Sequence, residues 1–98
     1  MATQTSVRYT TRDAGAADAN QLLIDAVFAE LADVTPEGFS YRVARSEDGL
    51  SFEHVAVLDG ETNPLLALAS FQAFSSTVPE RVVAPPVVQT WDVVQRYC

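Results

Sequence analysis

A single histidine is the side chain best suited to chemistry in this sequence. His54 lies in the segment Phe52-Glu53-His54-Val55, where period-two alternation places it on the same apolar face as Phe52 and Ala56. A neutral imidazole with a pKa of about 6.5 can take a proton from, or give one to, a bound phenol or lactone. The alternative is a core histidine whose ring nitrogens are satisfied by neighbouring groups.

Aromatic and amide side chains supply candidate partners for this histidine. Tyr9 and Tyr41 each share a strand face with apolar residues, so their hydroxyls either orient an aromatic substrate or lie at the rim of a core. Trp91 either stacks on a planar ligand or fills a core or an interface. Asn20, expected near the start of the first helix, faces a pocket mouth or bonds to the helix terminus. Phe71, on an apolar helix stripe, completes the candidate binding set.

Other catalytic classes lack their motifs. The sequence contains no G-x-S-x-G elbow for a serine nucleophile and no glycine-rich loop for a nucleotide phosphate. One histidine and one cysteine, Cys98, do not make the three or four ligands that a zinc-type site needs. We therefore predict neither a metal nor another cofactor. Proton transfer remains, as does an oxidation in which the substrate itself supplies the electrons.

Composition and charge exclude several classes of binding partner. The 98 residues predict one domain, residues 1–98, and 48% of them are hydrophobic. Six arginines, no lysine and thirteen acidic residues give a net charge of -7, which repels nucleic acid and anionic lipid. No apolar run approaches the roughly 20 residues of a membrane span. The lone Cys98 cannot form an internal disulfide, which favours a reducing, cytoplasmic setting.

Hydrophobic periodicity and turn residues predict six elements. An amphipathic first helix ends before Thr35-Pro36 and begins at a capping pair, Asp18 with Gln21. Thr62 or Asn63 caps a second helix, and Pro79 ends this helix or caps its last turn. The four predicted strands cover residues 7–12, 39–46, 50–58 and 87–97, with an Asp-Gly hairpin turn between the second and the third.

The order β-α-β-β-α-β defines an α+β fold of the ferredoxin-like type. In this arrangement both helices cover one face of a four-stranded antiparallel sheet. The first and third strands are central neighbours, so Tyr9 and His54 are expected to approach each other. The single fold unit leaves no place for a linker or a second domain.

The predicted third and fourth strands carry apolar residues on both faces. A sheet with helices on one side only should expose polar residues on the other. A second copy of the chain is the economical cover for the free face, and we therefore predict a homodimer. The alternative is that the valines reflect β propensity alone.

Several short motifs carry a resemblance to a known family. They are Pro36-Glu37-Gly38 before Tyr41-Arg42, Phe52-Glu53-His54-Val55 and Phe71-Gln72-Ala73-Phe74, together with Asn63-Pro64-Leu65 and Pro85-Pro86. Over nearly the whole chain the pattern resembles the dimeric α+β barrel superfamily, and within it the proteins related to antibiotic biosynthesis monooxygenases. The last three motifs together look similar to a branch of short bacterial proteins of unassigned function.

The resemblance implies a small-molecule pocket between the helices and the sheet of each subunit. The superfamily includes cofactor-independent quinone-forming oxygenases, haem-degrading enzymes, muconolactone-type isomerases and members without known activity. The resemblance therefore implies a monooxygenase-like enzyme that acts on a small aromatic or lactone-type molecule, with His54 as the proton-transfer group. The departures are Leu58, where such relatives carry a tryptophan, and Leu65, near the place of a helix histidine. They favour the alternative, a non-catalytic homodimeric module that binds a small molecule or serves only as a structural assembly.

Overall fold

The computed structural model describes residues 2–97 of the chain. Its strands and helices follow one another in the order β1 (Thr3–Thr10), α1 (Ala14–Val34), β2 (Phe39–Arg45), β3 (Ser51–Leu58), η1 (Pro64–Ala67), α2 (Ala69–Ser76), η2 (Val78–Glu80) and β4 (Val87–Asp92). The elements η1 and η2 are short 3₁₀ helices on either side of α2. This order confirms the predicted β-α-β-β-α-β fold.

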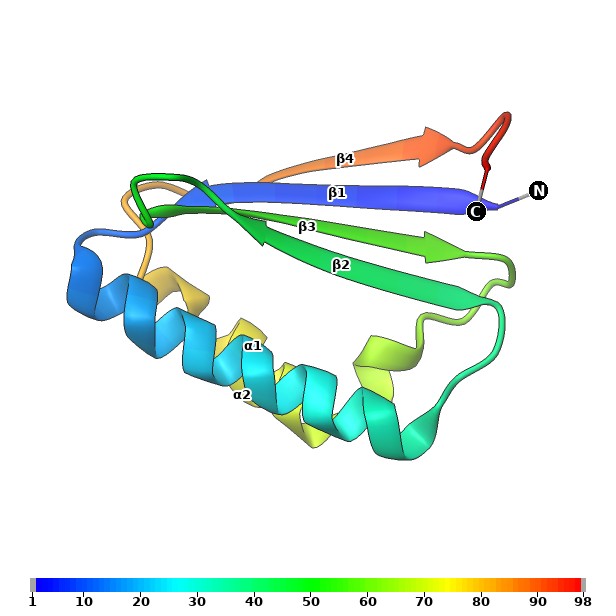
Figure 1. Cartoon of the computed structure of the whole chain (residues 1–98), viewed down its shortest axis with the longest axis horizontal. Helices are drawn as coiled ribbons and strands as arrows, with labels where there is room; N and C mark the ends of the chain where they lie inside the picture. Colours follow the sequence, from blue (N-terminus) through cyan, green and yellow to red (C-terminus); the bar gives the residue numbers. More distant parts are fainter. Residues whose placement is uncertain (1, 98) are drawn as a thin grey trace.

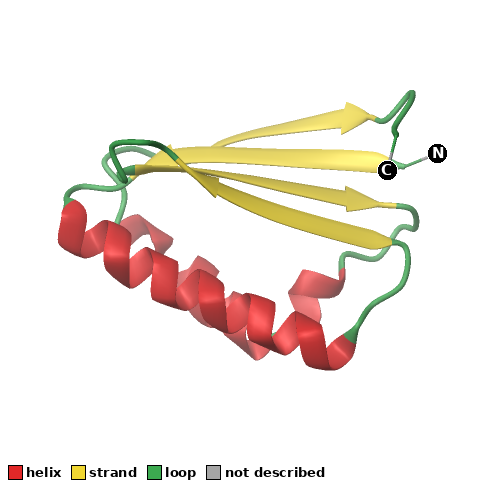
Figure 2. Ribbon diagram, in the orientation of Figure 1, coloured by secondary structure: helices red, strands yellow, loops and turns green. Residues whose placement is uncertain are grey.

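The four strands form one antiparallel sheet in the order β2-β3-β1-β4. Both helices lie on the same side of this sheet, as Figures 1 and 2 show, so the fold has one helical layer and one sheet layer. The first and third strands are central, as predicted. The edge strand β4 is exposed along its whole length, so the helical layer does not cover it.

Apolar side chains from both layers form the core. Ile24 and Val27 of α1 pack with Phe52 of β3, Leu65 of η1 and Phe74 of α2, and each is at most 5% exposed. The helical spacing of the apolar residues in α1 and the period-two spacing in β3 place these side chains between the layers. This core holds the helices against the sheet around His54.

The start of α1 differs from the prediction. Asp13, not Asp18, is the N-cap, and its Oδ1 accepts a hydrogen bond from the Ala16 amide at 2.8 Å. The small residues after Asp13 are good helix formers or tolerated there, so the helix begins five residues before Asp18. Asp18 instead forms an exposed ion pair with Arg45. The end of α1 agrees with the prediction, since Thr35 takes a left-handed conformation with φ 46°.

Three other boundaries also differ. Asn63 caps a helix with Pro64 in its first turn, as predicted, but that helix is the short η1, and α2 starts separately at Ala69. The first strand begins at Thr3, because the threonines of its polar start pair with both neighbouring strands. The fourth strand ends at Asp92, where its pairing with β1 runs out at Thr3, and not at residue 97.

The sheet face away from the helices is more polar than predicted. The strand register alternates its side chains, so β3 contributes Val55 and Val57 and β4 contributes Val87 and Trp91. Between them β1 contributes only polar residues, namely Gln4, Ser6, Arg8 and Thr10. The face therefore has apolar flanks and a polar centre.

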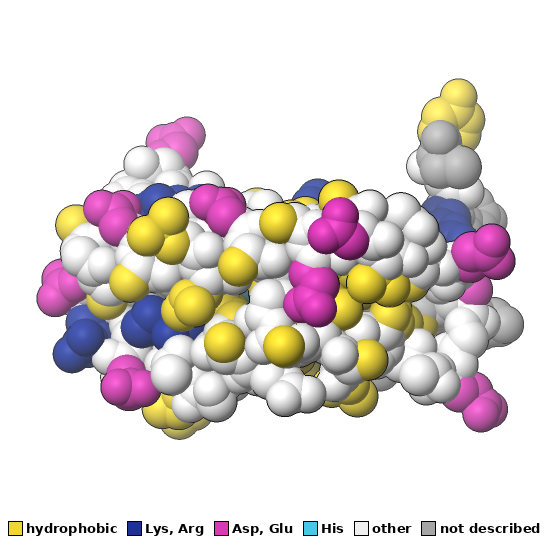
Figure 3. Space-filling model, turned by 90° about the horizontal axis from the view of Figure 1, so that it is seen from below, with side chains coloured by type: hydrophobic (Ala, Val, Ile, Leu, Met, Phe, Trp, Pro, Cys, Tyr) yellow, Lys and Arg dark blue, Asp and Glu magenta, His cyan; other side chains and the backbone are white. Residues whose placement is uncertain are grey.

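The surface charge is dispersed. Figure 3 shows acidic side chains spread over the whole helical side of the molecule rather than gathered in one patch. Within residues 2–97, no helix has the length and apolar content needed to cross a membrane.

Candidate active site

Two tyrosines hold His54 between the layers. The register sets His54 opposite Val7 of β1 and Val43 of β2, so its side chain points to the helical layer and is 5% exposed. The Tyr9 hydroxyl lies 2.6 Å from His54 Nε2, and the Tyr41 hydroxyl lies 2.6 Å from Nδ1. Both ring nitrogens are therefore engaged. The predicted approach of Tyr9 to His54 is confirmed.

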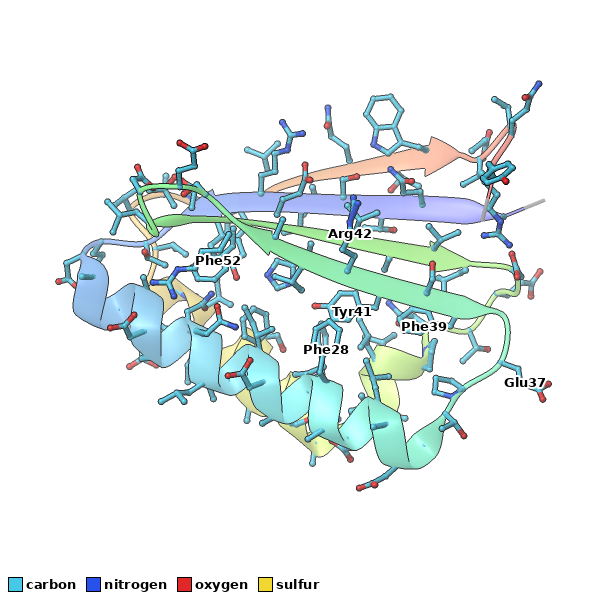
Figure 4. All side chains as sticks on the ribbon, in the orientation of Figure 1. Phe28, Glu37, Phe39, Tyr41, Arg42 and Phe52 are labelled. Carbon is cyan, nitrogen blue, oxygen red and sulfur yellow. The ribbon has the colours of Figure 1, made fainter. Side chains whose placement is uncertain are left out.

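The orientation of Tyr41 can be followed in Figure 4. Tyr41 and Phe39 of β2 point towards the helical layer, whereas Arg42, the residue after Tyr41, points to the opposite side of the sheet. The Tyr41 ring stacks on Phe28 of α1 with ring centres 5.2 Å apart. This stacking fixes the ring that carries the hydroxyl.

Burial keeps the Tyr9–His54–Tyr41 cluster uncharged. Desolvation lowers the pKa of His54 to about 4, because the imidazolium would lie away from water. Desolvation raises the pKa of Tyr9 to about 12 although the Asn20 hydrogen bond and the Arg81 charge oppose that shift. It also raises the pKa of Tyr41, and the nearby Tyr9 adds to the rise. At pH 7 all three groups are neutral, and the pKa of His54 lies below the ordinary imidazole value of about 6.5.

The cluster continues into a buried polar chain. Asn20 Nδ2 donates to the Tyr9 hydroxyl at 2.8 Å, and Arg81 Nε donates to Asn20 Oδ1 at 2.8 Å. Arg81 also donates to the Phe74 carbonyl at 2.9 Å and to the Thr77 hydroxyl. The side chain of Asn20 is fully buried and that of Arg81 nearly so. Five residues distant in sequence thus share one hydrogen-bonded path.

An apolar cavity of about 400 Å³ lies beside this cluster. Tyr9, Tyr41 and His54 provide polar atoms on its wall, and Phe71, Phe74 and other apolar groups provide most of the rest. Its border includes Pro79, Pro86 and the exposed Val88 of β4. The volume falls within the range of small-ligand sites, and a few polar groups on an apolar wall are typical of such sites.

A wider hollow of about 580 Å³ lies near Arg8 and Arg45. Its arginines already have partners, since Arg8 contacts Glu53 at 2.6 Å and Arg45 contacts Asp18 at 3.1 Å. The His54 side chain does not line it. The cavity beside His54 is therefore the better candidate for chemistry. Within the described residues, no group of three or more histidine, cysteine, aspartate or glutamate side chains is placed to hold a metal ion.

The predicted site residues divide into two groups. Tyr9, Tyr41, His54 and Phe71 meet at the cavity. Asn20 and Trp91 do not line it. Asn20 lies inside α1 rather than at its start, and it acts on the site through Tyr9.

Trp91 lies on the outer face of the sheet, on the side of β4 opposite Val88. Half of its surface is exposed, so the prediction of a core position is wrong. Its place on this face leaves the interface role open as a prediction.

Sequence reasoning missed Arg81. It lies just after η2 in a segment without periodicity, 61 residues from Asn20, and it looks like any other scattered arginine. Only its apolar neighbours Val78, Val82 and Val83 hint at burial, and that hint is weak. Its contact with Asn20 arises from the tertiary fold alone.

Comparisons with known proteins show which solved structures share this fold. No protein-family model and no curated protein matches the sequence. Among solved structures, Rv0793 from Mycobacterium tuberculosis matches with TM-score 0.78 and 17% identity, over 100% of both chains. A Nitrosomonas europaea protein described as a candidate antibiotic biosynthesis monooxygenase matches with TM-score 0.76 and 11% identity, over 95% of this chain and 90% of the other.

A third structure is a variant of SnoaB, a cofactor-independent oxygenase from Streptomyces nogalater. It matches with TM-score 0.66 and 17% identity, over 97% of this chain and 95% of the other. The chain thus has the ferredoxin-like fold of the antibiotic biosynthesis monooxygenase-like proteins, which confirms the resemblance at the level of the fold. A shared fold does not by itself determine the reaction.

Proposed function

We propose that this protein is a cofactor-independent, monooxygenase-like enzyme for a small aromatic or lactone-type molecule. The observation that carries the proposal is the 400 Å³ apolar cavity with the Tyr9–His54–Tyr41 cluster on its wall. The structural match to SnoaB, an oxygenase that works without a cofactor, supports the same reaction class. The substrate is held between the helical layer and the sheet, with Phe71 and Phe74 against its rings.

The reaction needs only the substrate and dioxygen. A ring methylene next to a phenol or ketone loses a proton to solvent, and the resulting carbanion adds dioxygen to form a C–O bond. The peroxide takes up a proton, its O–O bond breaks, and the second ring hydrogen leaves with the hydroxide as water. The net change is CH₂ + O₂ → C=O + H₂O, so the substrate supplies all the electrons. His54 acts through Tyr41, whose hydroxyl contacts the substrate oxygen and stabilises the anion.

Dioxygen uptake tests this proposal. With anthrone as the probe, the wild type is expected to consume one dioxygen per quinone formed, as measured with an oxygen electrode and by absorbance. Tyr41→Phe is expected to lower kcat roughly 100-fold, because it removes one donor to the anion. Tyr97→Phe, which removes the hydroxyl of a fully exposed tyrosine, is the matched control and should retain the activity. No uptake above the uncatalysed rate with anthrone or related polycyclic phenols would contradict the enzyme proposal.

The alternative is a binding module without catalysis. It is favoured by the low pKa of His54, which makes the imidazole a weak base at neutral pH. In that case the same probes bind in the cavity but no dioxygen is consumed. Binding of anthrone in calorimetry without dioxygen uptake from the same solution would identify the binding module.

We further propose a homodimer formed through the outer face of the sheet, in a reducing cytoplasm. Val87 and Trp91 are 63% and 50% exposed there, and Val55 and Val57 extend the apolar area. Light scattering is expected to give twice the chain mass of 10.6 kDa. Trp91→Glu should shift the mass towards the monomer, whereas Leu66→Glu, at an equally exposed leucine of η1 on the helical side, should leave the dimer intact. A wild-type mass of 10.6 kDa at all concentrations would contradict the dimer.

A further inference from the structure

The hydrogen-bonded path from Arg81 to Tyr41 has a fixed direction. A guanidinium only donates, so the Arg81 Nε–H must meet an acceptor, and this fixes the amide of Asn20 with Oδ1 towards Arg81. Its Nδ2 then faces Tyr9 as a donor. The orientation of Asn20, usually ambiguous between two flips, is set by its charged neighbour.

The next step determines the tautomer of His54. Among the described residues Tyr9 has two hydrogen-bond partners, Asn20 Nδ2 and His54 Nε2. Because Asn20 donates to Tyr9, the only acceptor left for the Tyr9 O–H is Nε2. The proton of the neutral imidazole is therefore on Nδ1, and Nδ1–H donates to the Tyr41 hydroxyl.

The last step leaves a donor at the cavity. Tyr41 accepts from His54, and within residues 2–97 its own O–H has no protein acceptor. The Tyr41 side chain lines the cavity. We propose that Arg81 and Asn20 are positioning residues that impose a one-way hydrogen-bond relay through Tyr9 and His54, so that Tyr41 donates and the cavity selects a ligand with an acceptor oxygen, a carbonyl or a phenolate.

The relay has a chemical consequence for the proposed function. A ligand oxygen that gains negative charge draws the Tyr41 proton towards it, and each bond along the relay strengthens in the same direction. The positive charge of Arg81 lies at the far end. This inference rests on the proposed function in one respect, namely that a ligand binds in the cavity. It does not require that the protein catalyses a reaction.

Nuclear magnetic resonance of the ring nitrogens tests the relay directly. His54 is the only histidine, so a protein labelled with ¹⁵N shows one imidazole. Two-bond ¹H–¹⁵N correlations at pH 7 are expected to show a protonated Nδ1 and an unprotonated Nε2. An Nε2–H tautomer in the wild type would overturn the inference, whatever the result of the dioxygen assay.

Asn20→Asp is the matching variant, because it reverses the relay with almost no change in shape. The new carboxylate still accepts a hydrogen bond from Arg81, but it now also presents an acceptor to Tyr9. The Tyr9 O–H therefore donates to this carboxylate, and the Tyr9 oxygen accepts a hydrogen bond from His54 Nε2–H. The Tyr41 O–H then donates to Nδ1 and offers the cavity a lone pair. Gln95→Glu, at an exposed position, controls for the added charge. An unchanged tautomer in a folded Asn20→Asp protein would overturn the inference.

Ligand preference gives the second readout. The probes are 1-tetralone, which has only an acceptor, its parent tetralin, which has neither, and 1-naphthylamine, which offers N–H donors. The wild type is expected to bind 1-tetralone roughly fivefold more tightly than tetralin in calorimetry, and Tyr41→Phe should remove that preference. Asn20→Asp should shift the preference to 1-naphthylamine. Equal affinity of the wild type for all three probes would contradict the selection of an acceptor.

Discussion

Replacement of Arg81 by leucine is expected to lower the free energy of unfolding by roughly 3 kcal/mol. The guanidinium donates to Asn20 Oδ1, to the Phe74 carbonyl and to the Thr77 hydroxyl. It also lies over the Phe74 ring, 5.3 Å from its centre. Leucine keeps part of the volume but leaves the buried Asn20 Oδ1 without a donor, and it leaves the Phe74 carbonyl with only a long hydrogen bond from the Thr77 hydroxyl at 3.4 Å. An unsatisfied buried group costs about 1–3 kcal/mol, and the lost contacts of the guanidinium add to that cost. Urea unfolding followed by circular dichroism measures the change.

Arg96→Leu is the matched control for Arg81. Arg96 is half exposed and forms an ion pair with Asp59 at 3.0 Å, in contact with solvent. Exposed pairs of this kind contribute between zero and about 1 kcal/mol. Both variants replace one arginine with leucine, so the difference between their free energies of unfolding reports the contribution of the buried contacts of Arg81. Equal losses in the two variants would contradict the buried relay.

Acid is expected to destabilise the protein well before its carboxylates are protonated. The pKa of His54 is about 4 in the folded protein and 6.5 in its ordinary state. Between these values the unfolded chain binds the proton and the folded chain does not, so stability falls as the pH falls. Roughly 3 kcal/mol is lost between pH 6.5 and pH 4, of which about 2 kcal/mol is lost by pH 5.

His54→Gln isolates this effect, because glutamine still hydrogen bonds but does not titrate. Unfolding at fixed protein concentration between pH 6.5 and pH 5 should show a slope in the wild type and none in this variant. Below about pH 4.5 both proteins lose stability. There Glu30 and Asp48, whose pKa values are lowered by hydrogen bonds to serines, become protonated. A wild-type slope that persists in His54→Gln would contradict the buried neutral imidazole.

The predictable part of the fold follows local rules. The alternation around His54 predicted which face of β3 is buried. Helical spacing predicted an apolar stripe on α1 that includes Val27 and is widened by Ile24, and both are buried, although Val34 at its end is exposed. The first residue of α1 was harder to predict, because aspartate is a good N-cap at both Asp13 and Asp18. Only the tertiary packing of the first turn selects Asp13. The end of β4 depends on where its partner strand ends, which no local pattern contains.

The candidate site was predictable in part for the same reason. Strand order follows from topology, so the approach of Tyr9 to His54 could be foreseen. The engagement of Nδ1 by Tyr41 depends on β2 pairing with β3 in one register. The role of Arg81 depends on the path of the chain after η2. The low pKa of His54 depends on its burial, and the sequence left a reactive histidine and a core histidine open as alternatives.

A crystal structure of the complex with 1-tetralone tests the central claim most directly, namely that the cavity beside His54 is the ligand site. The account predicts the bicyclic ring between the helical layer and the sheet, against Phe71 and Phe74. It predicts the carbonyl oxygen within hydrogen-bond distance of Tyr41 Oη. A ligand seated instead in the hollow near Arg8, or a cavity closed by side chains with no ligand, would contradict the account.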